Sequence, residues 1–287
     1  MSYVIHGATG AQGTPVLNRL KAAGKPVVAA ARKAGTADDG TPVVAARYSS
    51  VDELTAAYEG ADGVFVHLPI GPEEERAAYA GTIVAALSVA RPGRVVVSTS
   101  GAVVDSPGSP LQAGADAAVP TLIRGLEETG LSYAVIAPRL FLENLLLPPV
   151  LDAVRAEGVL RYPLRADFPV SWSSHLDNAD AAAALFDRTD ITGTVAVGQH
   201  PGLTGPDIAA AFGAHIGRTV SYEPITPEEF GRQLSPVIGA GGAAGVAGLY
   251  AWFATATENT IAADNSAQRI LGLKPRSAHQ WLEEVGR

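Results

Sequence analysis

Short apolar runs alternate with amphipathic segments through the first half of the chain. The runs are rich in valine, alanine and isoleucine and nearly free of polar residues, which is typical of strands buried on both faces of a sheet. They predict strands at 3–6, 25–31, 42–46, 63–68, 94–98 and 133–137. The segments between them predict helices at 14–23, 51–58, 73–90 and 115–129. This alternation predicts an α/β fold, a doubly wound parallel sheet of the Rossmann type.

The pattern becomes less regular after residue 144, where prolines occur at 148, 149, 163 and 169. Apolar and polar positions still predict helices at 178–188, 206–216, 228–234, 265–271 and 279–285, and strands at 194–197 and 219–224. We therefore expect a dinucleotide-binding domain over 1–148, completed by about 176–200, and a smaller, mostly helical substrate-binding lobe over 149–287. The ligand site is expected between the two.

Composition excludes several classes of protein. The 287 residues carry a net charge of −8, which argues against a nucleic-acid binder with its basic face. The absence of cysteine excludes disulfides and thiolate chemistry. No basic, apolar leader precedes the first strand, so we expect a cytoplasmic protein. The six histidines lack metal-ligand spacing, so no metal site is expected.

One uncharged stretch, 233–257, is long enough to cross a bilayer. It contains Pro236 and many glycines and alanines, and its large apolar residues gather only at 249–253. We expect a loop and a small-residue helix packed on the protein, and no contact with a membrane.

A glycine-rich turn follows the first strand directly. Gly7, Gly10 and Gly13 have the spacing G-x-x-G-x-x-G, and the last glycine opens a helix. Strand, turn and helix N-terminus together let backbone N–H groups and the helix dipole bind a pyrophosphate. The alternative is a tight turn without a ligand. The predicted cofactor contacts in this turn are Gly7, Thr9, Gly10, Ala11, Gln12 and Gly13.

The end of the second strand indicates which dinucleotide is bound. Sites for NAD carry an acid roughly 20 residues past the glycines, on the ribose hydroxyls. This chain has Arg32 and Lys33 there and no acid between Arg19 and Asp38. A guanidinium can bind a 2′-phosphate through two hydrogen bonds, which favours NADP(H) over NAD(H). Alternatively, both side chains are solvated loop charges.

The chain resembles the NmrA-like group of atypical short-chain dehydrogenases/reductases. The resemblance rests on the glycine turn with Arg32, on the segment 138–144 (Pro-Arg-Leu-Phe-Leu-Glu-Asn) and on 175–181 (His-Leu-Asp-Asn-Ala-Asp-Ala). It continues at 217–220, 224–230 and 274–281. Three departures stand out: Arg47-Tyr48 replaces an acidic residue expected at the adenine, Arg139 replaces a glycine, and no lysine occurs near 115.

The resemblance implies three functions. Relatives include quinone and dye reductases, tailoring enzymes of aromatic polyketides, and NADP(H)-sensing regulators. None of the four lysines follows a tyrosine by four residues, so the Tyr-x-x-x-Lys acid pair of the wider superfamily is absent. A quinone needs little acid catalysis, because its reduction gives a stable phenolate. We expect hydride transfer from NADP(H) to a quinone or polycyclic aromatic. The alternatives are a monooxygenase-type hydroxylation of an aromatic polyketide and a non-catalytic redox sensor. A homodimer is possible from the sequence.

Carboxyl ends of the predicted parallel strands supply the candidates near the nicotinamide. Leu68 and Pro69 are expected to line the cofactor. Ser98 is expected beside it as well, and Ser98 and Ser100 are candidates to hydrogen-bond a substrate carbonyl, unless they only complete the turn. His67 is a candidate acid, with a packed structural role as the alternative.

The substrate is expected at aromatic residues further along the chain. Phe141 and Asn144 follow the sixth strand; Asn144 either orients a substrate oxygen or caps a helix. Glycines at 239, 241 and 242 suggest a hinge, with 243–257 as a lid. Asp177 and Asp180 are expected to cap or brace their helix. Four aromatic residues of the second lobe are predicted either to form a wall against a flat substrate ring or to belong to the core of that lobe: Trp172, Tyr250, Trp252 and Phe253.

Overall fold

A single eight-stranded sheet organises the first lobe in the computed structural model, which describes residues 2–286. Its spatial order is β11-β7-β6-β5-β1-β2-β4-β3. All neighbours are parallel except β3 and β4. The strands are β1 (Tyr3–His6), β2 (Val27–Ala31), β3 (Gly35–Thr36), β4 (Pro42–Ala45), β5 (Gly63–His67), β6 (Val95–Ser98), β7 (Tyr133–Pro138) and β11 (Gly193–Val197). The predicted doubly wound parallel fold is confirmed, and the strand order reverses between β1 and β5.

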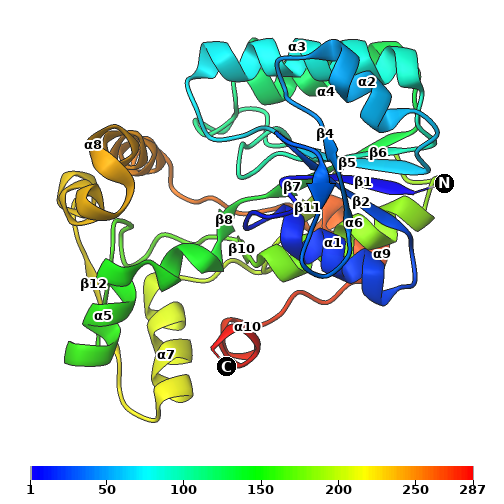
Figure 1. The fold of residues 1–287 in the computed structure, drawn as a ribbon. Coiled ribbons are helices and arrows are strands. Elements are labelled where there is room, and N and C mark those ends of the chain that lie inside the picture. The colour runs from blue at the N-terminus through cyan, green and yellow to red at the C-terminus, as the bar shows by residue number, and fades with distance from the viewer. Residues whose placement is uncertain (1, 287) are drawn as a thin grey trace.

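Helices cover both faces of this sheet (Figure 1). One face carries α1 (Gly13–Ala22), α6 (His175–Asp187) and α9 (Ala267–Leu271); the other carries α2 (Val51–Tyr58), α3 (Glu73–Ala90) and α4 (Ala118–Thr129). Successive strand residues alternate between the faces, so Ile5 packs under the first set of helices and Val4 under the second. Burial on both sides explains why the strands are continuously apolar.

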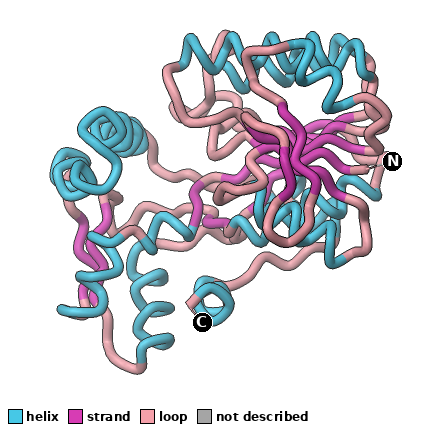
Figure 2. Tube along the Cα trace, in the orientation of Figure 1, coloured by secondary structure: helices cyan, strands magenta, loops and turns pink. Residues whose placement is uncertain are grey.

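The second lobe is mostly helical and contains two short parallel strand pairs, β8–β10 and β9–β12 (Figure 2). Prolines 148 and 149 open a helix there instead of interrupting structure, since proline is well tolerated in a first helical turn. The elements are β8 (Leu140–Phe141), η1 (Leu142–Leu146), α5 (Pro148–Glu157), β9 (Val159–Tyr162), β10 (Trp172–Ser173), α7 (Gly205–Ile216), β12 (Ser221–Pro224), α8 (Pro227–Phe253), η2 (Ala263–Asn265) and α10 (Ala278–Val285).

The chain passes between the lobes more often than the expected division at 148 implies. Val103 and Leu111 pack in the core of the second lobe, although they precede β7 in sequence. Conversely, Ala267 and Ile270 of α9 return to the core beneath the sheet. The lobes are therefore joined along several segments and not by one linker.

Helix α8 corrects the expectation that 233–257 is a loop followed by a small-residue helix. The whole span from Pro227 to Phe253 is helical, interrupted only at Gly239 with φ 77° and ψ 162°. Among the described residues it is the one helix with the length and composition to cross a membrane. One such helix is weak evidence for a membrane span, because core helices of soluble proteins meet the same criteria. Its Phe230 and Phe253 anchor it in the second-lobe core, while most of its length is exposed.

Candidate active site

The turn after β1 has the geometry of an anion-binding loop. Gly7 adopts φ 62°, a conformation that favours glycine, and its carbonyl accepts the Gly10 N–H at 2.8 Å. A Cβ on Gly13 would lie 2.2 Å from the Gly7 carbonyl oxygen, so only glycine lets α1 start this close to β1. Thr9, Gly10 and Ala11 are exposed at the N-terminus of α1. Their position leaves the helix start open to a phosphate.

His67 lies across the switch point from this turn, at the end of β5. Its ring packs so closely on Gly7 that a Cβ there would be 2.3 Å from Nε2. Burial lowers the pKa of His67, so the ring is neutral, and Nε2 is buried without a hydrogen-bond partner among the described residues. An orphaned polar atom at the point where a doubly wound sheet binds its ligand fits a dinucleotide site.

Tyr48 supports the end of β5 through a hydrogen bond to its last residue. Its hydroxyl donates to the His67 carbonyl at 2.8 Å, and its ring stacks on His6 with centroids 5.0 Å apart. His6 in turn hydrogen-bonds the Tyr58 hydroxyl at 2.7 Å, and burial lowers the pKa of His6 to about 3. Tyr48 stands where the family resemblance predicted an acid at the adenine, and its observed contacts are structural.

Arg32 and Lys33 follow β2 directly and are exposed. Within residues 2–286 neither side chain makes a hydrogen bond or an ion pair that would hold it elsewhere. Both side chains are therefore available for a 2′-phosphate, and this role stays a prediction beside the alternative of solvated loop charges.

Ser98 and Ser100 are engaged by Gln12, the residue that precedes α1. The Gln12 amide donates to Ser100 Oγ at 2.9 Å, while Ser98 Oγ donates to Gln12 Oε1 at 2.9 Å. Ser98 Oγ also accepts the Ser100 N–H at 3.2 Å. These bonds join the end of β6 to the glycine turn and fit the alternative in which the serines complete the turn. Leu68 is buried and Pro69 half-buried beside them.

The aromatic residues expected to form a substrate wall are mainly core. Trp172, Tyr250 and Phe253 are 3%, 3% and 2% exposed, which is the alternative that the sequence left open. The Asn144 amide faces the buried Tyr162 and Tyr250 hydroxyls. Trp252 is the exposed member, and its indole donates to the Pro110 carbonyl at 3.0 Å. Contact of Tyr250 or Phe253 with a flat substrate would require this core to open.

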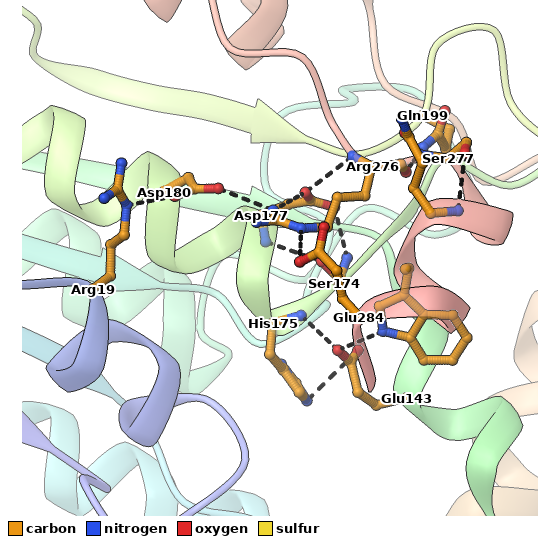
Figure 3. A network of polar contacts seen from close by, with 12 residues as sticks. Arg19, Glu143, Ser174, His175, Asp177, Asp180, Gln199, Arg276, Ser277 and Glu284 are labelled. Atoms are coloured by element: carbon orange, nitrogen blue, oxygen red, sulfur yellow. Dashed lines mark hydrogen bonds and ion pairs between the residues drawn. The ribbon is translucent and has the colours of Figure 1, made fainter. Parts of the chain in front are cut away.

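A network missed from the sequence fixes the start of α6 (Figure 3). Ser174 and Asp177 form a capping box, and Arg276 donates to Asp177 and Asp180 at 2.9 Å each. Asp180 also pairs with Arg19 of α1 at 2.6 Å. The expectation that both aspartates cap or brace the helix is confirmed, and the C-terminal segment proves to be their partner.

Sequence reasoning assigned no role to His175 and Glu143, which lie beside the predicted substrate residue Phe141. The His175 ring stacks on Phe141 with centroids 4.2 Å apart. Glu143 accepts the His175 backbone N–H at 2.9 Å and the Trp281 indole N–H at 3.2 Å (Figure 3). Both residues lie in the segments that carry the family resemblance, which was the available signal. No group of three or more potential metal ligands occurs within the described part of the chain.

Comparison with known proteins gives a family and a fold. The model of the NmrA-like family matches residues 3–282. The NAD(P)H azoreductase of Xenophilus azovorans is 30% identical over 237 residues, covering 79% of this chain and 78% of the relative. A (4-alkanoyl-5-oxo-2,5-dihydrofuran-3-yl)methyl phosphate reductase of Streptomyces griseus subsp. griseus is 29% identical over 231 residues, covering 77% of this chain and 76% of the relative.

Two solved structures illustrate the shared fold. The NADPH-dependent quinone oxidoreductase of Escherichia coli, complexed with NADPH, superimposes with a TM-score of 0.78 at 18% identity and covers 99% of this chain and 100% of its own. The triphenylmethane reductase of Citrobacter sp. has a TM-score of 0.78 at 16% identity, with 100% of both chains covered. At these identities the likeness establishes architecture only.

Proposed function

Because the chain belongs to the NmrA-like family, we propose that it is an NADP(H)-dependent reductase of quinones or related polycyclic aromatic compounds. The observation that carries the proposal is the pairing of an open glycine turn with two unengaged cations after β2. The relative named NAD(P)H azoreductase supports NAD(P)H-dependent reduction. The structures named as quinone oxidoreductase and triphenylmethane reductase share the fold in which such reduction occurs.

In the proposed complex, the turn Gly7–Gly13 holds the pyrophosphate through backbone N–H groups. Arg32 and Lys33 bind the 2′-phosphate, which selects NADP(H). Leu68 and Pro69 cover the reactive half and keep water away. When bound, the reduced nicotinamide supplies a hydride.

The missing Tyr-x-x-x-Lys pair favours an acceptor whose reduced form is a weak base. A quinone meets this condition because hydride uptake gives a phenolate stabilised by its ring, so positioning and exclusion of water supply much of the rate. A simple ketone would give a far more basic alkoxide, which needs a strong proton donor.

Anaerobic oxidation of NADPH, followed by nicotinamide absorbance against quinones of increasing ring number, tests the proposal. Turnover that increases with ring number supports a reductase of polycyclic substrates. Tight NADPH binding without turnover of any quinone would contradict it and favour a redox-sensing protein. Oxygen uptake coupled to NADPH loss on an aromatic polyketide would instead indicate hydroxylation.

A further inference from the structure

We propose that His175 donates a hydrogen bond from Nδ1 to the substrate oxygen that becomes negative during reduction, and that Glu143 positions its ring. This inference rests on the proposed reductase function. It assigns an acceptor-oxygen site to a chain that lacks the tyrosine donor of its superfamily.

The position of His175 along the sheet edge supports this role. The pyrophosphate turn follows β1 and the candidate phosphate cations follow β2, so the reactive half of a dinucleotide extends the other way, past β5, β6 and β7. Phe141 follows β7 and stacks on the His175 ring. His175 also lies within electrostatic range of His67, at the end of β5.

Unpaired polar atoms gather along this edge. His175 is 8% exposed, and its Nδ1 has no hydrogen-bond partner among the residues described. Thr99 Oγ1 after β6 and His67 Nε2 at the end of β5 are buried and unpartnered in the same way. Leaving a buried polar atom unpaired is energetically costly, so three of them near one edge indicate a place for polar ligand atoms.

Glu143 determines which nitrogen of His175 carries the hydrogen. Its Oε1 already accepts two N–H groups, from the His175 backbone and the Trp281 indole. The other oxygen, Oε2, is buried, unpartnered and 4.0 Å from His175 Nε2. A proton on Glu143 therefore belongs on Oε2, where it faces Nε2 and leaves the imidazole hydrogen on Nδ1. The gap must close by about 1 Å on ligand binding, as is common for catalytic contacts in unliganded sites.

Charges around the pair are consistent with this arrangement. Burial raises the pKa of Glu143, with the nearby Asp177 carboxylate adding to the rise, so the carboxyl binds a proton more readily than a free glutamate does. Burial, with a contribution from His67, lowers the pKa of His175 to about 4, so its imidazole is neutral. Arg276 is committed to Asp177, Asp180 and Glu284. A neutral imidazole can serve as a hydrogen-bond donor to an oxyanion without giving up its proton.

The reduction consumes one hydride from NADPH and one proton from water. The quinone takes up one hydride and becomes a hydroquinone monoanion, with the negative charge on the oxygen that accepts the His175 hydrogen bond. Water then supplies the one proton that completes the hydroquinone. His175 ends the cycle in its starting tautomer.

The test compares two substitutions at His175 in the NADPH-loaded protein. His175→Leu should lower kcat for a quinone by roughly 100-fold, the usual effect of losing one oxyanion donor, with NADPH affinity unchanged. His175→Asn should keep kcat within about tenfold of the original, because its amide nitrogen occupies nearly the position of Nδ1. Equal quinone turnover by His175→Leu and the unchanged protein would overturn the role of His175 but leave the proposed reductase function standing. No quinone turnover by the unchanged protein would instead overturn the proposed function.

A second readout does not depend on turnover. 4-Nitrophenol, whose colour reports ionisation, mimics the phenolate product and is titrated into the NADP⁺-loaded protein. A donor at Nδ1 should lower the apparent pKa of the bound phenol in the unchanged protein and in His175→Asn, but not in His175→Leu. Identical titrations in all three proteins would refute the role of Nδ1 even if a variant were poorly active.

Glu143 is tested through the pH profile. Glu143→Gln offers an amide donor to His175 Nε2 at every pH, so kcat should be retained and should no longer vary with the ionisation of residue 143. In the unchanged protein kcat should fall as Glu143 ionises and draws the imidazole hydrogen to Nε2. A large loss of kcat in Glu143→Gln at neutral pH would contradict the positioning role.

Discussion

Gly7 and His67 are in contact across the point where the strand order reverses: a Cβ on Gly7 would lie 2.3 Å from His67 Nε2. Gly7 directly follows β1, and His67 ends the neighbouring parallel strand β5. The missing side chain at Gly7 is what admits the imidazole ring beside the turn. Turn and ring therefore act as one unit, and a change at either position should affect both.

Gly7→Ala should reduce stability and weaken NADPH binding at least tenfold, because the methyl group collides with His67 and the turn must shift. Gly24→Ala is the matched control, since Gly24 also has a positive φ, 72°, but nothing lies within 4 Å of its Cβ. The control should lose only the cost of a left-handed alanine, about 1–2 kcal/mol. Urea unfolding and NADPH titration measure both effects. Adding His67→Ala to Gly7→Ala should restore part of the loss; no restoration would show that the contact is not its cause.

Arg32→Ala should weaken NADPH binding by about 10–100-fold, because a charge-assisted hydrogen-bond pair to the 2′-phosphate is lost. NADH lacks this phosphate, so its affinity should change by about twofold or less. This is well below the tenfold change in affinity that corresponds to 1.4 kcal/mol. Calorimetric titration with both nucleotides makes the comparison. Arg91→Ala, which changes a remote cation at the end of α3, serves as the control. Equal losses for the two nucleotides would remove Arg32 as the selectivity residue.

Arg276→Ala should lower the free energy of unfolding by about 3 kcal/mol, since it leaves the Asp177 carboxylate, 4% exposed, without its cation. Arg188→Ala is a suitable control because the Arg188–Asp190 pair is on the surface, where such pairs contribute about 0–1 kcal/mol. Chemical denaturation compares the two. A similar loss in both variants would show that the clamp at the start of α6 is no stronger than a surface pair.

Stability should decrease as the pH falls below about 6.5. Burial holds the pKa of His6 at about 3 in the folded chain, whereas the unfolded chain binds this proton near pH 6.5. The unfolded state therefore takes up more protons between these values, and one such histidine costs up to about 1.4 kcal/mol per pH unit. His175 adds to the effect, because its pKa is lowered to about 4.

His6→Gln should make this decrease shallower, since glutamine still meets the Tyr58 hydroxyl but does not titrate. Unfolding free energies at pH 7 and pH 5 provide the measurement. The exposed His215 offers a control: His215→Gln should keep the original pH dependence. An unchanged slope in His6→Gln would mean that other groups cause the acid sensitivity.

Local sequence determined the sheet lobe. Continuous apolar runs alternating with amphipathic helices are typical of a parallel sheet covered on both faces, and α2 and α3 occupy the predicted residues, 51–58 and 73–90. The glycine turn was equally accessible, because glycine spacing and a positive φ are properties of a few consecutive residues. Elements that depend on distant partners were less predictable: β9 exists because β12 pairs with it from about 60 residues away, and no local pattern encodes that pairing.

Tertiary structure alone decided how the candidate site is completed. Gln12 meets Ser98 and Ser100 across more than 80 residues, so the sequence could nominate the serines but not show that they are engaged. Trp281 and Arg276 reach the start of α6 from the C-terminal segment, and this contact places Glu143 against His175. Sequence determines periodicity and turn chemistry because both are local, whereas hydrogen-bond partners depend on which surfaces the folded chain brings together.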